Sequence, residues 1–247
     1  MDRLVRTPEL MDGPLDGAVL AGNLRDLARV NRYLGGTRLS GRAMDRLLPD
    51  ERTRPSCHLL DIGTGSADIP AALIDRYAKR GITLTVHAID DRTEMVAAAR
   101  VRVGSRSDLT LEVTDGSVPL PYPDGTFDIA HCSLLLHHLR PDAATGLLRE
   151  AARVSRLGVI VNDLDRAAHF WAGAWLLSHL LTGNRYTRHD APLSVRRAYR
   201  VAEVEGIAAA AGLERTQRLQ GFLGHRYALV FVSSDSVPGS DSARPDA

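Results

Sequence analysis

The sequence predicts an α/β fold built around a mostly parallel β-sheet. From Cys57 onward, short apolar runs typical of strands alternate with longer amphipathic stretches typical of helices, which is the pattern of βαβ units. The first of these strands runs into a glycine-rich turn, LLDIGTGSADIP at residues 59–70. The chain has 247 residues, of which 44% are hydrophobic, enough to bury one full core. We therefore expect one domain with additions.

Five strands are expected in the parallel part of the sheet, followed by a closing hairpin. The predicted strands are 59–62, 84–89, 109–114, 127–133 and 158–162, with helices near 68–80, 93–103 and 142–155. A helical insertion at about 165–198 and a helix at 201–211 precede two antiparallel strands at 213–221 and 226–232. Right-handed crossovers bring the carboxyl ends of parallel strands to one edge, so residues that follow strands are candidates for a binding site.

Composition limits the classes of function. The formal net charge is +1 and the basic residues are scattered, which argues against a nucleic-acid or polybasic membrane surface. Cys57 and Cys132 lack metal-ligand spacing and suit a reducing compartment. The N-terminus has no apolar export signal, and the longest apolar stretch, 170–181, is shorter than the ~18–20 residues that span a bilayer. We expect a cytoplasmic monomer or homodimer without a metal or stable membrane insertion, acting on small molecules.

The glycine-rich turn indicates which cofactor binds. Gly63 and Gly65 match the first half of the dinucleotide fingerprint, but Asp68 stands where its third glycine belongs and would repel a pyrophosphate. Asp90 closes the next strand, where a carboxylate can accept both hydroxyls of a ribose. The nicotinamide cofactor and S-adenosylmethionine both carry a ribose. Carboxylates at Asp61 and Asp68 complement a cation and oppose a phosphate, which favours S-adenosylmethionine.

A third acidic position follows the third strand. Asp115 can accept a hydrogen bond from an adenine amino group, and the backbone after it can supply a donor. The predicted cofactor-binding residues are Asp61, Gly63, Thr64, Gly65, Asp68, Asp90, Asp91, Arg92, Asp115, Gly116 and Ser133.

In combination, these motifs resemble the class I S-adenosylmethionine-dependent methyltransferases, in particular the small-molecule branch similar to ubiquinone and menaquinone biosynthesis methyltransferases. LLDIGTGSAD resembles motif I, AIDDRTEM the ribose strand, DGSVPLPYPDGTFD the adenine segment and LLLHHL the start of the next helix, over roughly residues 57–163. The resemblance implies a doubly wound, Rossmann-like sheet of seven strands with the last one antiparallel. One departure is Ala67, which stands where the family's motif has a third glycine; we expect binding to be retained.

The pattern of the residues also indicates how the chain is organised. Residues 1–50 are expected to form an N-terminal helical lid segment, and 51–233 the methyltransferase domain, with 165–198 covering the acceptor. Residues 234–247 are rich in Ser, Asp, Pro and Gly and are predicted to be disordered. The apolar side of the helix around Trp175 and the N-terminal helices would together cover an acceptor above the sulfonium.

Methyl transfer requires an aligned acceptor, a dry site and often the removal of a proton. A neutral histidine can accept that proton from a phenol. The candidates are His137 and His138, which follow the fourth strand, and His189 with Asp190 on the insertion. The alternatives are that the first pair packs at the start of a helix and that the second lies in an exposed loop. The candidate acceptor-binding residues are Asn162, Trp175, Arg196, Arg197 and Tyr199.

These residues predict methylation, at oxygen or at an activated carbon, of a small hydrophobic acceptor such as a phenol, naphthol or quinone-like intermediate of polyketide type. The product of the cofactor would be S-adenosylhomocysteine. Two alternatives remain open: a nicotinamide-dependent oxidoreductase, and a partner protein that has the methyltransferase fold without catalysis.

Overall fold

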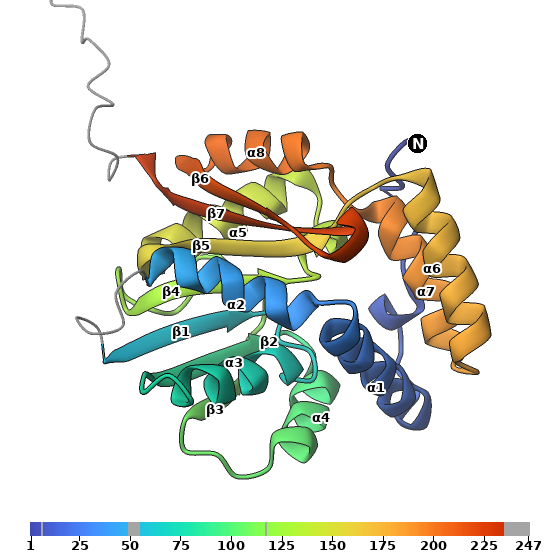
Figure 1. The fold of residues 1–247 in the computed structure, drawn as a ribbon, viewed down its shortest axis with the longest axis horizontal. Helices are drawn as coiled ribbons and strands as arrows, with labels where there is room; N and C mark the ends of the chain where they lie inside the picture. The colour runs from blue at the N-terminus through green and yellow to red at the C-terminus, as the bar shows by residue number, and fades with distance from the viewer. Residues whose placement is uncertain (6, 49–54, 117, 235–247) are drawn as a thin grey trace, which may run out of the picture.

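The computed structural model describes residues 1–5, 7–48, 55–116 and 118–234 (Figure 1). Its strands are β1 (Ser56–Ile62), β2 (Thr83–Asp90), β3 (Leu109–Val113), β4 (Phe127–Ser133), β5 (Ser155–Leu164), β6 (Leu213–Gln220) and β7 (Arg226–Ser233). They form a 7-stranded sheet in the order β3-β2-β1-β4-β5-β7-β6. β7 is antiparallel to both neighbours, and the other pairs are parallel. The predicted fold class is confirmed.

The helices follow the predicted alternation. The α-helices are α1 (Gly17–Tyr33), α2 (Gly36–Leu47), α3 (Asp68–Ala78), α4 (Thr93–Val103), α5 (Pro141–Val154), α6 (Ala168–Leu181), α7 (Arg185–Arg197) and α8 (Val201–Ala210). Three short 3-10 helices are η1 (Leu10–Asp12), η2 (Leu136–His138) and η3 (Phe222–Gly224). α1 and α2 are separated at Gly35, which has φ of 87°, a left-handed conformation that suits glycine.

Two buried clusters lie on the two faces of the sheet. One draws on α5 and α8, and the other on α2 and α3. The position of α2 differs from the lid that we expected for residues 1–50. Its apolar stripe of Leu39, Ala43 and Met44 is buried against the sheet, with Leu59 and Val230 in the same cluster. This helix is part of the core, whereas α1 remains outside it and packs on α4 and α7.

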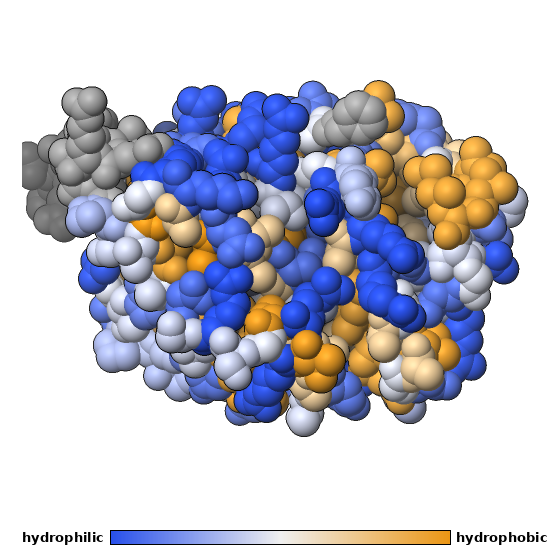
Figure 2. All heavy atoms as spheres, turned by 60° about the horizontal axis from the view of Figure 1, so that its bottom comes forward, coloured by the Kyte–Doolittle hydropathy of each residue, from blue (hydrophilic) through white to orange (hydrophobic). Residues whose placement is uncertain are grey.

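The insertion consists of α6 and α7, which lie with α1 beyond the carboxyl ends of the parallel strands (Figure 1). α6 does not bury the apolar side that we expected to face an acceptor. Ser178 is its one buried residue, while Trp175, Leu180 and Leu181 are 47%, 71% and 75% exposed. The reason is that α6 is apolar all round, so that packing one side on α7 leaves the rest uncovered. Figure 2 shows apolar groups at the end of the molecule where these helices lie.

Among the described helices, none combines the length and the apolar character needed to cross a bilayer. The tail that the sequence predicts to be disordered lies, from residue 235, outside the described residues.

Candidate active site

The glycine-rich turn joins β1 to α3 in a left-handed path. Gly63, Gly65 and Ala67 have φ of 70°, 56° and 53°. The φ of Gly63 lies in the left-handed region that side chains rarely adopt, which favours glycine there. Ala67 is fully buried and adopts a left-handed conformation, which is uncommon for a residue other than glycine.

Asp90, at the end of β2, is held against this turn. One carboxylate oxygen accepts a hydrogen bond from the Gly65 N–H at 2.8 Å, and the other accepts one from the Arg92 N–H at 3.1 Å. Burial raises the pKa of Asp90, and these two hydrogen bonds oppose that shift. Each carboxylate oxygen can accept a further hydrogen bond, so the side chain can still receive ribose hydroxyls.

The predicted adenine position is next to the ribose position. The Thr114 N–H donates to the Asp90 carbonyl at 3.0 Å, which places the end of β3 beside the end of β2. A Cβ atom at Gly116 would lie 3.3 Å from the side chain of Asp91. Asp115 is exposed between these contacts. The structure thus brings Asp90, Asp91 and the segment around Asp115 together, as their spacing predicted.

Asp61 and Asp68 are engaged by neighbouring side chains. Asp61 is buried and its Oδ1 lies 2.6 Å from Nδ1 of His131. Asp68 accepts hydrogen bonds from Asn31 at 3.0 Å and from the Ser66 hydroxyl at 3.2 Å. Asp61 lies just before the turn and Asp68 just after it, and both belong to a larger polar network.

Arg226 is the centre of this network and is fully buried at the start of β7. Its guanidinium donates to Asn31 at 2.7 Å, Ser133 at 3.0 Å and Asn162 at 3.2 Å. Burial lowers the pKa of Arg226 to about 10, although the charge of Asp163 opposes the shift. The network joins α1, β4, β5 and β7 on the side of the sheet that α2 covers.

Asn162 continues the network and does not face open space. Its amide donates to the Gly36 carbonyl at 2.9 Å and to the Ser40 hydroxyl at 2.8 Å, and Ser40 in turn lies 2.8 Å from Nε2 of His131. Both ends of the Asn162 amide are therefore occupied within the protein. This predicted acceptor-binding residue is placed where it fixes α2 against the sheet.

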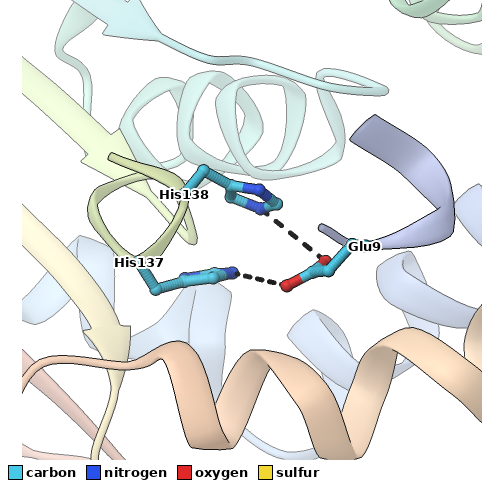
Figure 3. Close-up of side chains that lie close together, drawn as sticks. All are labelled: Glu9, His137 and His138. Carbon is cyan, nitrogen blue, oxygen red and sulfur yellow. Dashed lines mark ion pairs between the residues drawn. The ribbon is translucent and has the colours of Figure 1, made fainter. Parts of the chain in front are cut away.

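The two histidines after β4 meet a glutamate from the N-terminus (Figure 3). His137 is buried, with Nδ1 2.8 Å from Oδ1 of Asp163 and Nε2 3.7 Å from Oε1 of Glu9. His138 has Nδ1 3.0 Å from Oδ1 of Asp12 and Nε2 3.9 Å from Oε2 of Glu9. Burial raises the pKa of Glu9 to about 7. The sequence did not single out Glu9, because it follows no apolar period and lies far from the histidines in the chain.

The insertion holds the other predicted catalytic pair. Asp190 is buried and accepts hydrogen bonds from the N–H groups of Leu10 at 2.8 Å and Met11 at 3.1 Å. Nδ1 of His189 lies 2.7 Å from the same carboxylate, and the His189 side chain is 47% exposed. Asp190 therefore anchors the N-terminus and orients His189, whose Nε2 points away from this pairing.

The remaining predicted acceptor-binding residues do not share one surface. Arg197 pairs with Asp12 at 2.6 Å, and the Tyr199 hydroxyl donates to the Leu139 carbonyl at 2.9 Å. The Arg196 carbonyl accepts a hydrogen bond from the Leu4 N–H at 3.0 Å, and Trp175 is exposed on α6. Three of the four positions thus contact other parts of the rim or the N-terminus.

The N-terminal segment (residues 1–13, described except for residue 6) crosses this edge of the sheet. Arg92, just after β2, donates to the Gly13 carbonyl at 2.9 Å, while Asp12 contacts His138 after β4. Because β1 lies between β2 and β4 in the sheet, the segment passes in front of the end of β1 and its glycine turn.

Comparisons with known proteins agree with this geometry. Residues 59–158 match the family model of a methyltransferase domain. A ubiquinone/menaquinone biosynthesis C-methyltransferase of Paracoccus denitrificans is 32% identical over 117 residues, which are 47% of this chain and 43% of that protein. The chain thus aligns with less than half the length of this curated relative.

Two solved structures have the same fold at low identity. A S-adenosylmethionine-dependent methyltransferase from Aquifex aeolicus is 19% identical with a TM-score of 0.60, covering 88% of this chain and 98% of its own. Human N-acetylserotonin methyltransferase, solved with S-adenosylmethionine, is 15% identical with a TM-score of 0.60, covering 88% of this chain and 56% of its own. Residues 59–158 thus resemble a methyltransferase domain in sequence, and the chain shares the fold of these solved methyltransferases.

Proposed function

We propose that the chain is an S-adenosylmethionine-dependent methyltransferase that acts on a small, largely hydrophobic acceptor. The observation that carries the proposal is the position of Asp90, which is fixed by the Gly65 N–H against a left-handed glycine turn. A carboxylate in that place suits ribose hydroxyls, and the nearby Asp61 and Asp68 suit a cationic ligand better than a pyrophosphate.

The protein's own contribution is binding, orientation and proton removal. When bound, S-adenosylmethionine supplies a methyl group on a cationic sulfur, and S-adenosylhomocysteine remains after transfer. Asp90 receives the ribose, and the segment from Asp115 to Gly116 borders the adenine. The N-terminal segment crosses in front of the turn and limits the access of water.

For the proton we favour His189 among the predicted histidines. His137 and His138 both direct Nε2 to Glu9, whereas Nε2 of His189 is not engaged in its pairing with Asp190. In the neutral ring, an Nδ1–H that donates to Asp190 leaves the lone pair on Nε2. His189 is then the general base and Asp190 its positioning residue. Asp190 itself is not favoured as the base, because its two oxygens already accept hydrogen bonds from the N-terminal segment.

The acceptor class is inferred from the name of the curated relative, because the exposed aromatic side of α6 does not support it. The relative is named for ubiquinone and menaquinone biosynthesis. We propose a phenol, naphthol or quinone-like intermediate of polyketide type, methylated at oxygen or at an activated carbon. The chain is proposed to work in the cytoplasm as a monomer or homodimer.

Two measurements test this proposal. Isothermal titration with S-adenosylhomocysteine should show saturable binding in the micromolar range. Asp90→Asn should weaken it by about tenfold or more, since hydrogen bonds to a charged group contribute about 1.5–3 kcal/mol. Asp142→Asn, at an exposed carboxylate on α5, is the matched control and should leave the affinity unchanged.

A screen of acceptors with labelled S-adenosylmethionine then tests the reaction. Transfer only to amines, thiols, protein or RNA would contradict the proposed acceptor class. A change in NADH fluorescence on mixing, without binding of S-adenosylhomocysteine, would favour an oxidoreductase. Binding without transfer to any acceptor would favour a partner protein.

A further inference from the structure

Three potential metal ligands converge at the rim of the sheet. Glu9 at the start of η1 faces His137 and His138 of η2, and one ligand atom from each lies within 4.8 Å of the others (Figure 3). The two histidines address different oxygens of the same carboxylate, at 3.7 and 3.9 Å. These separations are too long for hydrogen bonds, so hydrogen bonding does not explain why the three side chains converge.

Both histidines are oriented by a carboxylate on the opposite side of the ring. Nδ1 of His137 pairs with Asp163 at 2.8 Å, and Nδ1 of His138 pairs with Asp12 at 3.0 Å. A neutral imidazole that donates Nδ1–H in this way carries its lone pair on Nε2, which here points to Glu9. A carboxylate behind the ring is the usual support of a histidine that binds a metal.

The Nε2 atom of His137 gives independent evidence of a missing ligand. His137 is 2% exposed, and among the described residues Nε2 has no hydrogen-bond partner. A buried polar atom without a partner is costly, and here it faces the oxygens of Glu9. A cation between the two groups would satisfy both.

We propose that Glu9, His137 and His138 bind one divalent transition-metal ion of the zinc class. Two imidazoles and a carboxylate with a fourth position left open form a set that zinc sites use, and imidazole favours such ions over Mg²⁺. In a tetrahedral site with bonds of about 2.0–2.1 Å, ligand atoms lie about 3.4 Å apart. The three ligand atoms lie within 4.8 Å of one another in the structure, so they would have to approach one another by up to about 1.4 Å to bind an ion.

The residues around Glu9, His137 and His138 are compatible with a bound cation and leave it a route from solvent. The Ser194 hydroxyl lies 2.9 Å from Oε1 of Glu9 and orients the carboxylate. One opposing charge is Arg197, 3.8 Å from the same oxygen, but it pairs with Asp12 at 2.6 Å. The side chain of His138 is 27% exposed, which gives an ion a route from solvent. Because Glu9 belongs to the N-terminal segment, the ion would fasten this segment to η2.

This site differs from the sequence-based expectation of no metal. A sequence indicates a metal site when the ligands are closely spaced along the chain. Of the three ligands here, only the adjacent His137 and His138 meet that condition. The inference does not depend on the proposed methyl transfer, since binding of the ion is measured without cofactor or acceptor.

The experiment uses the full chain, produced without a histidine tag and stripped with a chelator. Equilibrium dialysis against Zn²⁺ should give one ion per chain, and Mg²⁺ should not bind. Co²⁺ should produce the intense visible bands of a tetrahedral site. Glu9→Gln and His138→Gln should each lower the Zn²⁺ affinity by more than about 100-fold, because loss of an outer partner alone costs about 10–100-fold. His169→Gln, at an exposed histidine of α6, should have no effect.

Several outcomes would overturn the site. One is the absence of stoichiometric Zn²⁺ at micromolar free concentration in the wild-type chain. Another is wild-type affinity in both Glu9→Gln and His138→Gln. If a variant fails to fold, the stoichiometry and the Co²⁺ spectrum of the wild-type chain still decide, and an octahedral spectrum would count against the three ligands.

Discussion

At the scale of single residues, Arg226 carries the largest predicted effect on stability. It is fully buried, donates to groups on three other elements and lies near the charges of Asp163 and Asp68. Arg226→Met should lower the free energy of unfolding by about 3–5 kcal/mol, because it leaves buried polar and charged partners uncompensated. Urea denaturation followed by circular dichroism measures the change.

The control for this prediction is Arg218→Met on β6, where the arginine is exposed. Its free energy of unfolding should change by no more than about 0.5 kcal/mol. An equal loss in the free energy of unfolding of the two variants would show that the hydrogen bonds of Arg226 contribute nothing to stability.

His189 is the residue whose replacement separates binding from chemistry. His189→Gln should lower kcat by about 10²–10⁴-fold, the usual contribution of a general base, while the affinity for S-adenosylhomocysteine stays unchanged. Steady-state transfer to the acceptor found by screening, together with titration, measures both quantities. His169→Gln serves as the control. A loss of less than about tenfold would exclude a base at this position, and C-methylation of an acidic carbon would be compatible with that result.

The sequence indicated some site residues and could not indicate others, for a physical reason. The positions of Asp90 and Asp115 at one edge of the sheet could be predicted, because the ends of parallel strands meet there whatever the details of packing. Glu9 and Arg226 could not, because their partners are far away in the chain and no local pattern requires them.

At the scale of elements, the hydrophobic pattern predicted well which helices and strands are present. It predicted their first and last residues with uneven accuracy. β4 has the bounds 127–133 that the sequence predicted, because a Pro-Asp-Gly turn precedes its apolar run. β5 begins at Ser155 instead of 158, since its first residues are polar and follow α5 directly. α2 was assigned to a lid because its stripe of apolar residues reveals a buried side without revealing what covers it.

The exposed apolar surface of α6 leads to a prediction that tests whether anything covers this helix in solution. Leu180→Glu with Leu181→Glu should change the free energy of unfolding by less than about 1 kcal/mol, because both side chains are mostly exposed. The same variant should bind less of a hydrophobic fluorescent dye.

The comparison variant for α6 is Leu193→Glu on the neighbouring α7, where leucine is 8% exposed. Burying an unpaired carboxylate there should cost several kcal/mol. A large loss of stability in the α6 variant would mean that another part of the protein, or a second copy, covers this helix in solution.

At the scale of the whole molecule, the N-terminal segment connects parts that the sheet leaves separate. Arg3 donates to the Arg197 carbonyl at 2.6 Å and to the Leu139 carbonyl at 2.9 Å, so it joins α7 to the loop after η2. The segment then reaches Asp190 on α7 and Arg92 at the start of α4. Neither of the two clusters that cover the sheet includes residues 1–13, so the segment contacts this edge of the sheet without forming part of these clusters.

Deletion of residues 1–13 should therefore keep the fold and weaken cofactor binding. We expect native circular dichroism, a stability loss of about 1–3 kcal/mol from the two backbone donors that Asp190 loses, and an affinity for S-adenosylhomocysteine lowered by about tenfold or more. The affinity falls because Arg92, beside the ribose position, is released and the glycine turn is opened to water. Titration in the presence of a chelator removes any contribution of a metal, and deletion of 235–247 is the control of equal length. Unchanged affinity after the first deletion would mean that the segment crosses the site without closing it.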